Sequence, residues 1–384
     1  MRELLNYCEE HLDETVAVIE ALVRLESPST DKAAVDRCGR ELASRLRAIG
    51  ATVETLPQPE RGDHIRARVS GRSPDPSERR ESKGVLILGH FDTVWPIGTL
   101  ERMPLHRHGD RLHGPGTFDM KGGIAIALSA LAALEATGTS HPPVTMLWTT
   151  DEEIGSGTSR AAIEAEARKM AAVLVLEPAL PGGALKTARK GVGEFELTVH
   201  GVSAHAGLDP GKGASAIHEL AAQIAVIERL QDLPRGISVN VGVISGGSRT
   251  NVVAEQARAL IDARAPTLAA AAAVESAIRG LQPLRTGTRL TVRGGFERPP
   301  MERSPAVLEL FARASEVASP LGRELREGSA GGGSDGNFTA ALGVPTLDGL
   351  GPIGDGAHAA HEHVDVASLP WRAALLAGLL CRLA

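Results

Sequence analysis

The chain has 384 residues, more than one hydrophobic core usually supports, so we expect two domains. Its net charge of -6 and aromatic content of 3% leave neither a basic footprint nor a stacking platform for nucleic acid. No apolar run approaches the length that spans a membrane, and residues 1–10 lack the apolar stretch of a secretory signal. Three scattered cysteines indicate neither a disulfide framework nor a thiolate zinc site. We therefore expect a cytoplasmic protein that binds neither nucleic acid nor membrane.

The first half of the chain has the pattern of an α/β domain. Residues 11–25 and 33–49 are predicted to form amphipathic helices, and the polar stretch 71–84 is predicted to form an exposed loop. Short apolar runs then alternate with helical stretches, one after Gly122 and one across residues 160–171. The runs are Val85–Leu88, Val144–Trp148 and Val173–Leu176. This alternation predicts a parallel sheet with crossover helices.

From Glu194 the pattern changes to that of a second, inserted domain. Its order is strand, helix, strand, strand, helix, strand, over residues 194–200, 213–230, 237–244, 257–265, 268–281 and 288–293. That order is typical of a ferredoxin-like α+β sandwich. The α/β pattern then resumes with a helix over 306–318, a Gly-rich turn at 331–336, a strand over 345–350 and a terminal helix. We predict an α/β domain formed by residues 1–190 and 299–384, interrupted by a domain of residues 191–298.

Acidic and histidine residues follow each apolar run of the first domain. The sequence GHFD ends the first run, TTDEEIGS follows the second and EP follows the third. In open α/β sheets, ligands bind beyond the carboxyl ends of the strands. The pattern therefore predicts a site at this edge of the sheet.

Some of these residues have the chemistry of metal ligands. His90 and Asp92 lie two positions apart, so one side chain can bind a metal while the other orients a ligand of that metal. A histidine at a strand end, however, is often structural. Asp119 precedes the glycines that open a helix. Its carboxylate can bridge two cations about 3.5–4 Å apart, or it can cap the helix.

Further carboxylates and histidines complete the set. Glu152 and Glu153 are adjacent, so that one can bind a metal and the other can act as a general base, or both can form a solvated turn. Glu177 directly follows an apolar strand and is costly to bury unless it is paired or ligated. His358 lies in a loop with His361 and His363, which leaves three candidates. Together these nitrogen and oxygen donors are typical of a catalytic zinc site.

The chain resembles the co-catalytic zinc metallopeptidase family of glutamate carboxypeptidases, aminoacylases and acetylornithine or succinyl-diaminopimelate deacylases. The resemblance covers essentially the whole length and rests on five motifs. They are GHFDTV at 89–94, GTFDMKG at 116–122, TDEEIGS at 150–156, SAHAG at 203–207 and GSD at 333–335. It implies a zinc-peptidase-like catalytic domain with an inserted dimerisation domain.

The resemblance also implies roles for single residues. It makes His90 and Glu177 ligands of one zinc ion, Glu153 and His358 ligands of the other, and Asp119 the bridge. His358 is selected over the other two histidines because Glu362 follows it by four positions, although His361 and His363 replace the family's more usual residues. Asp92 would orient His90, and Glu152 would be the general base. His205 would stabilise the oxyanion in the partner chain of a homodimer.

For the substrate, the resemblance points to Asn251, Arg264, Arg298 and Gly333. An arginine fork suits a terminal carboxylate, although both arginines could instead be exposed strand-end charges. With glutamate at position 177, the chain resembles the carboxypeptidase and deacylase branch of the family. Within that branch, the sequence resembles the glutamate carboxypeptidases most.

We therefore expect a hydrolase with two Zn²⁺ per chain, which Co²⁺ or Mn²⁺ could replace. It would cleave a C-terminal amide and release an amino acid, glutamate, from a peptide, folate-like or N-acylated substrate. The alternatives are an N-acyl amino acid deacylase with the same chemistry and, in another class, a non-catalytic dimeric metal-binding or regulatory protein.

Overall fold

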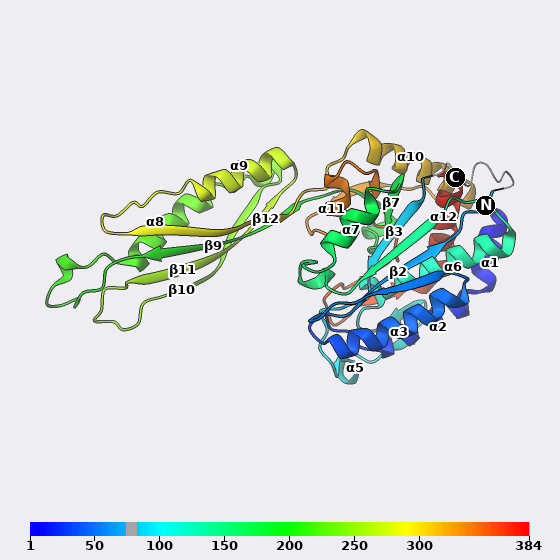
Figure 1. Ribbon diagram of the computed structural model, residues 1–384, viewed down its shortest axis with the longest axis horizontal. Helices are drawn as coiled ribbons and strands as arrows, with labels where there is room; N and C mark the ends of the chain where they lie inside the picture. Colours follow the sequence, from blue (N-terminus) through cyan, green and yellow to red (C-terminus); the bar gives the residue numbers. More distant parts are fainter. Residues whose placement is uncertain (74–82, 384) are drawn as a thin grey trace. The chain divides into compact units, whose positions relative to one another are not determined.

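The computed structural model describes residues 1–73 and 83–383, so most of the loop predicted at 71–84 lies outside the described residues. The chain divides into two compact units, each with its own hydrophobic core (Figure 1). Unit 1 comprises Met1–Thr187, Arg303–Ala330 and Ser334–Ala384, and unit 2 comprises Ala188–Glu302 with Gly331–Gly333.

The central sheet of unit 1 has six strands among the described residues, in the order β1-β2-β6-β3-β7-β14. Strands β6, β3, β7 and β14 are parallel, whereas β1 and β2 pair antiparallel at one side. The strands are β1 (Thr52–Leu56), β2 (His64–Val69), β3 (Val85–His90), β6 (Val144–Thr149), β7 (Ala172–Val175) and β14 (Thr346–Leu347). The predicted α/β fold with a mostly parallel sheet is confirmed.

Helices cover both faces of this sheet (Figure 1). Val85 and Ile87 of β3 pack into the larger core with α1, α2, α3, α6, α10 and α12, whereas Leu86 and Leu88 face the smaller core with α7 and α11. The helices are α1 (Arg2–Glu10), α2 (Leu12–Arg24), α3 (Lys32–Ala48), α6 (Gly122–Thr137), α7 (Arg160–Ala167), α10 (Pro305–Ala318), α11 (Gly336–Ala341) and α12 (Leu369–Arg382). Because side chains alternate along a strand, both faces of β3 are buried, and Val85–Leu88 form a continuous apolar run before Gly89 and His90.

Helix α6 is the core helix of unit 1. The segment Thr117–Thr137 has the length and apolar composition of a membrane-crossing helix, which differs from the sequence expectation. However, 83% of its apolar window is buried inside the protein, as in the core helices of globular domains.

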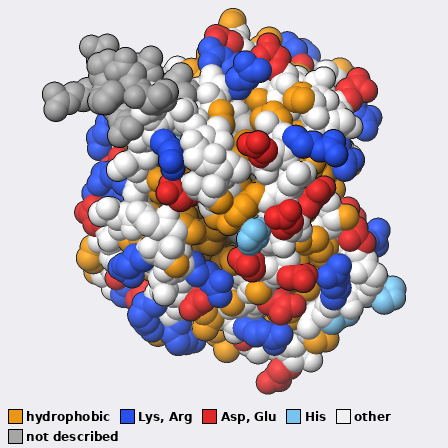
Figure 2. Space-filling view, turned by 90° about the vertical axis from the view of Figure 1, so that its right-hand side faces the viewer, with side chains coloured by type: hydrophobic (Ala, Val, Ile, Leu, Met, Phe, Trp, Pro, Cys, Tyr) orange, Lys and Arg blue, Asp and Glu red, His pale blue; other side chains and the backbone are white. Residues whose placement is uncertain are grey.

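The surface of the molecule carries both signs of charge. On the face drawn in Figure 2, acidic and basic side chains are interspersed.

Short elements complete unit 1, and the last of these strands before unit 2, β8, ends in the first residues of unit 2. A second sheet has the order β15-β16-β5-β4, and β13 pairs with β8. These elements are β4 (His106–His108), β5 (Arg111–His113), β8 (Leu185–Arg189), β13 (Glu327–Ala330), β15 (Gly354–Asp355) and β16 (His363–Asp365), with the short helix α5 (Thr99–Arg102). The loop between β15 and β16 contains His358.

Unit 2 has the predicted ferredoxin-like order of elements. Its antiparallel sheet has the order β10-β11-β9-β12. The elements are β9 (Gly191–His200), α8 (Ala216–Glu228), β10 (Ser238–Gly246), β11 (Gln256–Ala265), α9 (Leu268–Arg279) and β12 (Arg289–Arg298). Burial alternates along β11, so that Ala259 and Ile261 pack in the core with both helices while Leu260 is exposed.

The strand predicted over residues 345–350 is wrong beyond Leu347. The chain turns at Gly349, whose φ of +77° lies in the left-handed region. The buried Arg372 of α12 then donates hydrogen bonds to the carbonyls of Gly349 and Gly351. These two carbonyls therefore accept hydrogen bonds from a side chain, and the segment after Leu347 forms a loop instead of extending the sheet.

Candidate active site

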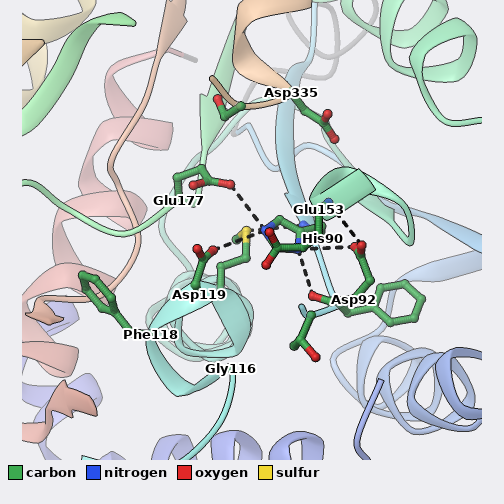
Figure 3. A network of polar contacts seen from close by, with 12 residues as sticks. His90, Asp92, Gly116, Phe118, Asp119, Glu153, Glu177 and Asp335 are labelled. Atoms are coloured by element: carbon green, nitrogen blue, oxygen red, sulfur yellow. Dashed lines mark hydrogen bonds and ion pairs between the residues drawn. The ribbon is translucent and has the colours of Figure 1, made fainter. Parts of the chain in front are cut away.

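The sheet brings three of the predicted metal ligands, His90, Glu153 and Glu177, to one edge, where Figure 3 shows them beside Asp119. His90 ends β3, Glu153 lies in a 3-10 turn after β6, and Glu177 comes two residues after β7. Because these strands are parallel neighbours, their carboxyl ends meet. Asp119 lies in the turn before α6, and His358 lies in the loop between β15 and β16.

The five side chains form two groups that share Asp119. In the first, Nε2 of His90 lies 3.4 Å from Oδ1 of Asp119 and 3.4 Å from Oε1 of Glu177. In the second, Nε2 of His358 lies 3.3 Å from Oδ2 of Asp119 and 3.0 Å from Oε2 of Glu153. The potential ligand atoms of each group lie within 4.8 Å of one another. Asp119 thus presents one oxygen to each group, as a bridging carboxylate would.

The charges of this cluster fit cations. Three carboxylates face two imidazoles, and the carboxylates of Asp119 and Glu153 raise the pKa of His358 to about 10. Burial raises the pKa of Glu153, because its negative charge is poorly solvated. Among the described residues, Nε2 of His90 and Oδ1 of Asp119 are buried without a hydrogen-bond partner. Divalent cations would both offset the negative charge and pair with these atoms.

Asp92 holds His90 in the orientation that a metal ligand needs. Nδ1 of His90 lies 3.1 Å from the backbone oxygen of Asp92 and 3.3 Å from its Oδ1. A proton on Nδ1 leaves the lone pair of Nε2 available to a metal. The Asp92 carboxylate also accepts a 2.7 Å hydrogen bond from Ser29 and a 3.3 Å hydrogen bond from the amide of Glu153.

The described parts of the histidine-rich loop distinguish its three histidines. His358 is in contact with the acidic cluster and has a left-handed φ of 60°, which is uncommon for a residue other than glycine. His361 is exposed and lies 3.9 Å from Asp355. The ring of His363 is buried, and its Nδ1 lies 3.0 Å from the His361 carbonyl. The geometry thus favours the histidine that the sequence selected only by its spacing to Glu362.

The turn that contains Glu152 and Glu153 is held by hydrogen bonds from its flanking residues to Asp335. The carboxylate of Asp335, at the N-terminus of α11, accepts hydrogen bonds from Ser156 and, at 3.1 Å, from Thr149. Glu152 itself is half-buried in this turn. In the sequence Asp335 stands out only as part of the GSD motif, because its partners lie 179 and 186 residues away and give no local signal.

Two further residues support the site and were missed from the sequence. Ser29, which holds Asp92, is 63 residues from its partner. Glu362 accepts backbone hydrogen bonds around Asp119. For Glu362 the local signal is its spacing of four positions from His358, which distinguishes the histidine but does not reveal the contacts of Glu362.

The remaining predicted residues belong to unit 2. His205 is exposed and pairs with Val252 in a β-bridge, beside Asn251, whose carbonyl accepts a 2.9 Å hydrogen bond from the amide of Ala206. Nδ1 of His205 accepts hydrogen bonds from the amides of Gly207 and Leu208, each 3.1 Å long. The proton of a neutral His205 therefore resides on Nε2, which is free of these contacts and can donate.

The two predicted arginines lie on either side of one strand. Arg264 of β11 and Arg298 of β12 both pair with Val192 of β9. Arg264 donates hydrogen bonds from two of its nitrogens to the carboxylate of Asp262, and the shorter of them is 2.6 Å long. The side chain of Arg298 is buried. The carbonyl of Gly333 accepts a 3.1 Å hydrogen bond from Arg189.

An α/β unit with histidines and carboxylates gathered at the carboxyl edge of its sheet, and with an inserted α+β unit, defines a metal-dependent hydrolase. The model of Peptidase family M20/M25/M40 matches residues 86–382, and the chain belongs to this family. The resemblance inferred from the five motifs is thus confirmed.

Individual relatives carry peptidase and deacylase names. Carboxypeptidase G2 of Pseudomonas sp. (strain RS-16) is 29% identical over 384 residues, which cover 96% of this chain and 89% of that protein. A succinyl-diaminopimelate desuccinylase of Paraburkholderia xenovorans (strain LB400) is 29% identical over 92% of this chain and 95% of that protein. The chain is therefore similar to both carboxypeptidases and deacylases of the family.

Solved structures share the fold. Aminopeptidase PepT from Bacillus cereus superimposes with a TM-score of 0.76 at 21% identity, over 97% of this chain and 98% of that one. An M20 family metallo-carboxypeptidase from Sulfolobus solfataricus superimposes with a TM-score of 0.69 at 16% identity, over 96% of this chain and 99% of that one. At these identities the likeness concerns the fold.

Proposed function

We propose that the protein is a dinuclear zinc amide hydrolase that releases a C-terminal amino acid, glutamate, from a peptide, folate-like or N-acylated substrate. The observation that carries the metal site is Asp119, whose two oxygens face two separate histidine–carboxylate groups. His90 and Glu177 would hold one ion and Glu153 and His358 the other. Bound there, the ions would acidify water and polarise the scissile carbonyl.

The chain's own residues supply the proton transfers. Glu152, in the turn beside the ligand Glu153, would take a proton from the attacking water and deliver it to the departing nitrogen. His205, from the partner chain of a homodimer, would donate a hydrogen bond from its Nε2–H to the carbonyl oxygen as negative charge develops there. The two amide hydrogen bonds that fix the His205 tautomer support this role.

An arginine would bind the carboxylate of the released amino acid. Arg264 already binds the carboxylate of Asp262 in a bidentate manner, which is the geometry that a substrate carboxylate would need. The glutamate preference rests on the resemblance of the sequence to the glutamate carboxypeptidases, including glutamate at position 177, and the similarity to carboxypeptidase G2 supports carboxypeptidase activity in general.

A substrate panel tests this proposal. Zinc-loaded protein should hydrolyse glutamate-terminated peptides and pteroylglutamate, and should fail on the same compounds with the terminal carboxylate converted to an amide. Replacing Arg264 with glutamine should raise KM for the carboxylate substrates. Equal turnover of the amidated compounds would remove carboxylate recognition from the proposal. Fewer than two metal ions per chain, without hydrolysis, would instead favour the non-catalytic alternative.

The second candidate function is N-acyl amino acid deacylation. It is favoured by the similarity to desuccinylases and to acetylornithine deacetylase of Klebsiella pneumoniae (strain 342), which is 28% identical over 62% of this chain. The chemistry is the same, and the acyl group differs. Preference for N-acetylornithine or N-succinyl-diaminopimelate over pteroylglutamate would select this function.

A further inference from the structure

Glu362 is a fully buried carboxylate at the end of the loop that contains His358. Its Oε1 accepts hydrogen bonds from the amides of Phe118 and Asp119, each 3.0 Å long. Its Oε2 accepts hydrogen bonds of 2.9 Å from the amide of Gly116 and of 2.9 Å from the indole of Trp95. All four partners are N–H donors, so the side chain is satisfied as an ionised carboxylate.

These donors come from two other segments of unit 1. Trp95 lies in the loop that follows His90 and Asp92, and the three amides belong to the turn that carries Asp119, labelled in Figure 3 by Gly116, Phe118 and Asp119. The backbone oxygen of Glu362 also accepts a 3.2 Å hydrogen bond from Gly114 of the same turn. One side chain thus joins the segments next to His90, Asp119 and His358.

We propose that Glu362 is a positioning residue for the two-metal site. It fixes the backbone at Asp119, so that the two carboxylate oxygens point to the two separate groups. The inference rests on the proposed metal site, because it gives Glu362 no function if Asp119 binds no metal. Glu362 contacts the backbone amide of Asp119 and acts on the metal site through that backbone.

The role requires a carboxylate of this length. In Glu362→Gln the amide group replaces one oxygen, so whichever way it turns, two N–H donors face another donor. Glu362→Asp keeps the charge but is one methylene shorter and cannot reach both segments equally well. Trp95→Phe removes a single donor and leaves three, which makes it the mildest change in the series.

The experiment measures zinc affinity of the full chain against a competing chelator, together with the visible absorption of the Co²⁺-loaded protein. We expect Glu362→Gln to weaken zinc binding by about 10- to 100-fold, as is typical when a residue that orients metal ligands is lost. Glu362→Asp should recover part of the affinity, and Trp95→Phe should lose least. The Co²⁺ spectrum should change with the same order, and kcat should fall more than KM rises.

Glu166→Gln is the matched control, because Glu166 is also a buried, hydrogen-bonded carboxylate of unit 1 but contacts Arg66 and Lys169 instead of the site. It should lower the melting temperature without changing zinc affinity or the Co²⁺ spectrum. Wild-type protein that binds no metal would refute the proposed function. Wild-type protein that binds two ions, with unchanged affinity and spectrum in Glu362→Gln, would refute only the role of Glu362. If Glu362→Gln does not fold, the same comparison is decided by Glu362→Asp and Trp95→Phe, since unchanged affinity in both refutes it.

Discussion

Single ligand residues should control how many metal ions are bound. His90 and His358 belong to different groups, and Asp119 belongs to both. We therefore expect His90→Ala and His358→Ala each to lower the metal content from about two ions to about one per chain, and Asp119→Ala to lower it to nearly none. The measurement is elemental analysis after dialysis against metal-free buffer.

His361→Ala is the control for this series. His361 lies in the same loop as His358, but its ring is 66% exposed and contacts Asp355 at 3.9 Å. Its removal should leave the metal content unchanged. A loss of metal in His361→Ala, with none in His358→Ala, would exchange the two assignments.

Glu152 and its neighbour Glu153 should be separable by experiment. Glu152→Gln should lower kcat by about 10²- to 10⁴-fold, because a general base is lost, while both metal ions remain bound. Glu153→Gln should instead lower metal content. Steady-state kinetics and elemental analysis on the same preparations check this, and a Glu152→Gln protein with the parent kcat would end the assignment of the base.

The sequence could predict the first layer of the site but not the residues behind it. His90, Glu153 and Glu177 follow apolar strands, and strand ends can be recognised in a sequence. Ser29 and Asp335 hold Asp92 and the Glu153 turn through hydrogen bonds over 63 and 179 residues. Such partners depend on the three-dimensional path of the chain, and a single sequence contains no periodicity or spacing that reveals them.

At the scale of elements, apolar strands were easier to predict than half-exposed ones. The buried β3 and β6 begin at the predicted residues, because all their side chains are apolar or shielded. The edge strand β1 was missed, since its sequence TVETL is polar and none of its residues is buried. Helix α7 ends at Ala167, four residues before the predicted end, and two turns at Lys169 and Met170 complete the connection to β7.

Helix α7 is joined to β2 by an ion pair between the buried Glu166 and the partly exposed Arg66, which should make stability depend on pH. Burial raises the pKa of Glu166, but hydrogen bonds from Lys169 and Arg66 lower it by more, so it lies below the usual value. A lowered pKa stabilises the fold above the unfolded value of about 4.3, and this stabilisation is lost as the pH falls through the folded pKa.

Glu166→Gln should therefore reduce the free energy of unfolding at pH 7 by about 1–3 kcal/mol, with a difference from wild type that shrinks below about pH 4. Urea denaturation at several pH values measures it. Glu164→Gln on the same helix is the control, because its partner Arg160 is 48% exposed and such a pair contributes at most about 0.5 kcal/mol. A difference that stays constant down to pH 3 would show that the ion pair is not its source.

At the scale of the whole molecule, the predicted groups divide between two units. All five candidate metal ligands belong to unit 1, whereas His205, Asn251 and the two arginines belong to unit 2. Unit 2 also exposes apolar side chains on β10 and β11, with Val243 55%, Ile244 63% and Leu260 37% exposed. A cluster of this kind is typical of a protein–protein interface, which supports the proposed homodimer.

A homodimer in which His205 acts on the partner's substrate makes a specific prediction for mixed subunits. Glu152→Gln and His205→Ala should each be inactive alone. In a mixed dimer, the chain with intact Glu152 receives His205 from the other chain, so one of two sites is complete. Random exchange at equal concentrations should therefore restore about a quarter of wild-type activity, because half of the dimers are mixed. If His205 instead acts within its own chain, neither site of a mixed dimer contains both groups, and refolded mixtures should stay inactive. Ile244→Arg, placed on the exposed apolar strand, should prevent the restoration by weakening association, which sedimentation velocity would register independently of turnover.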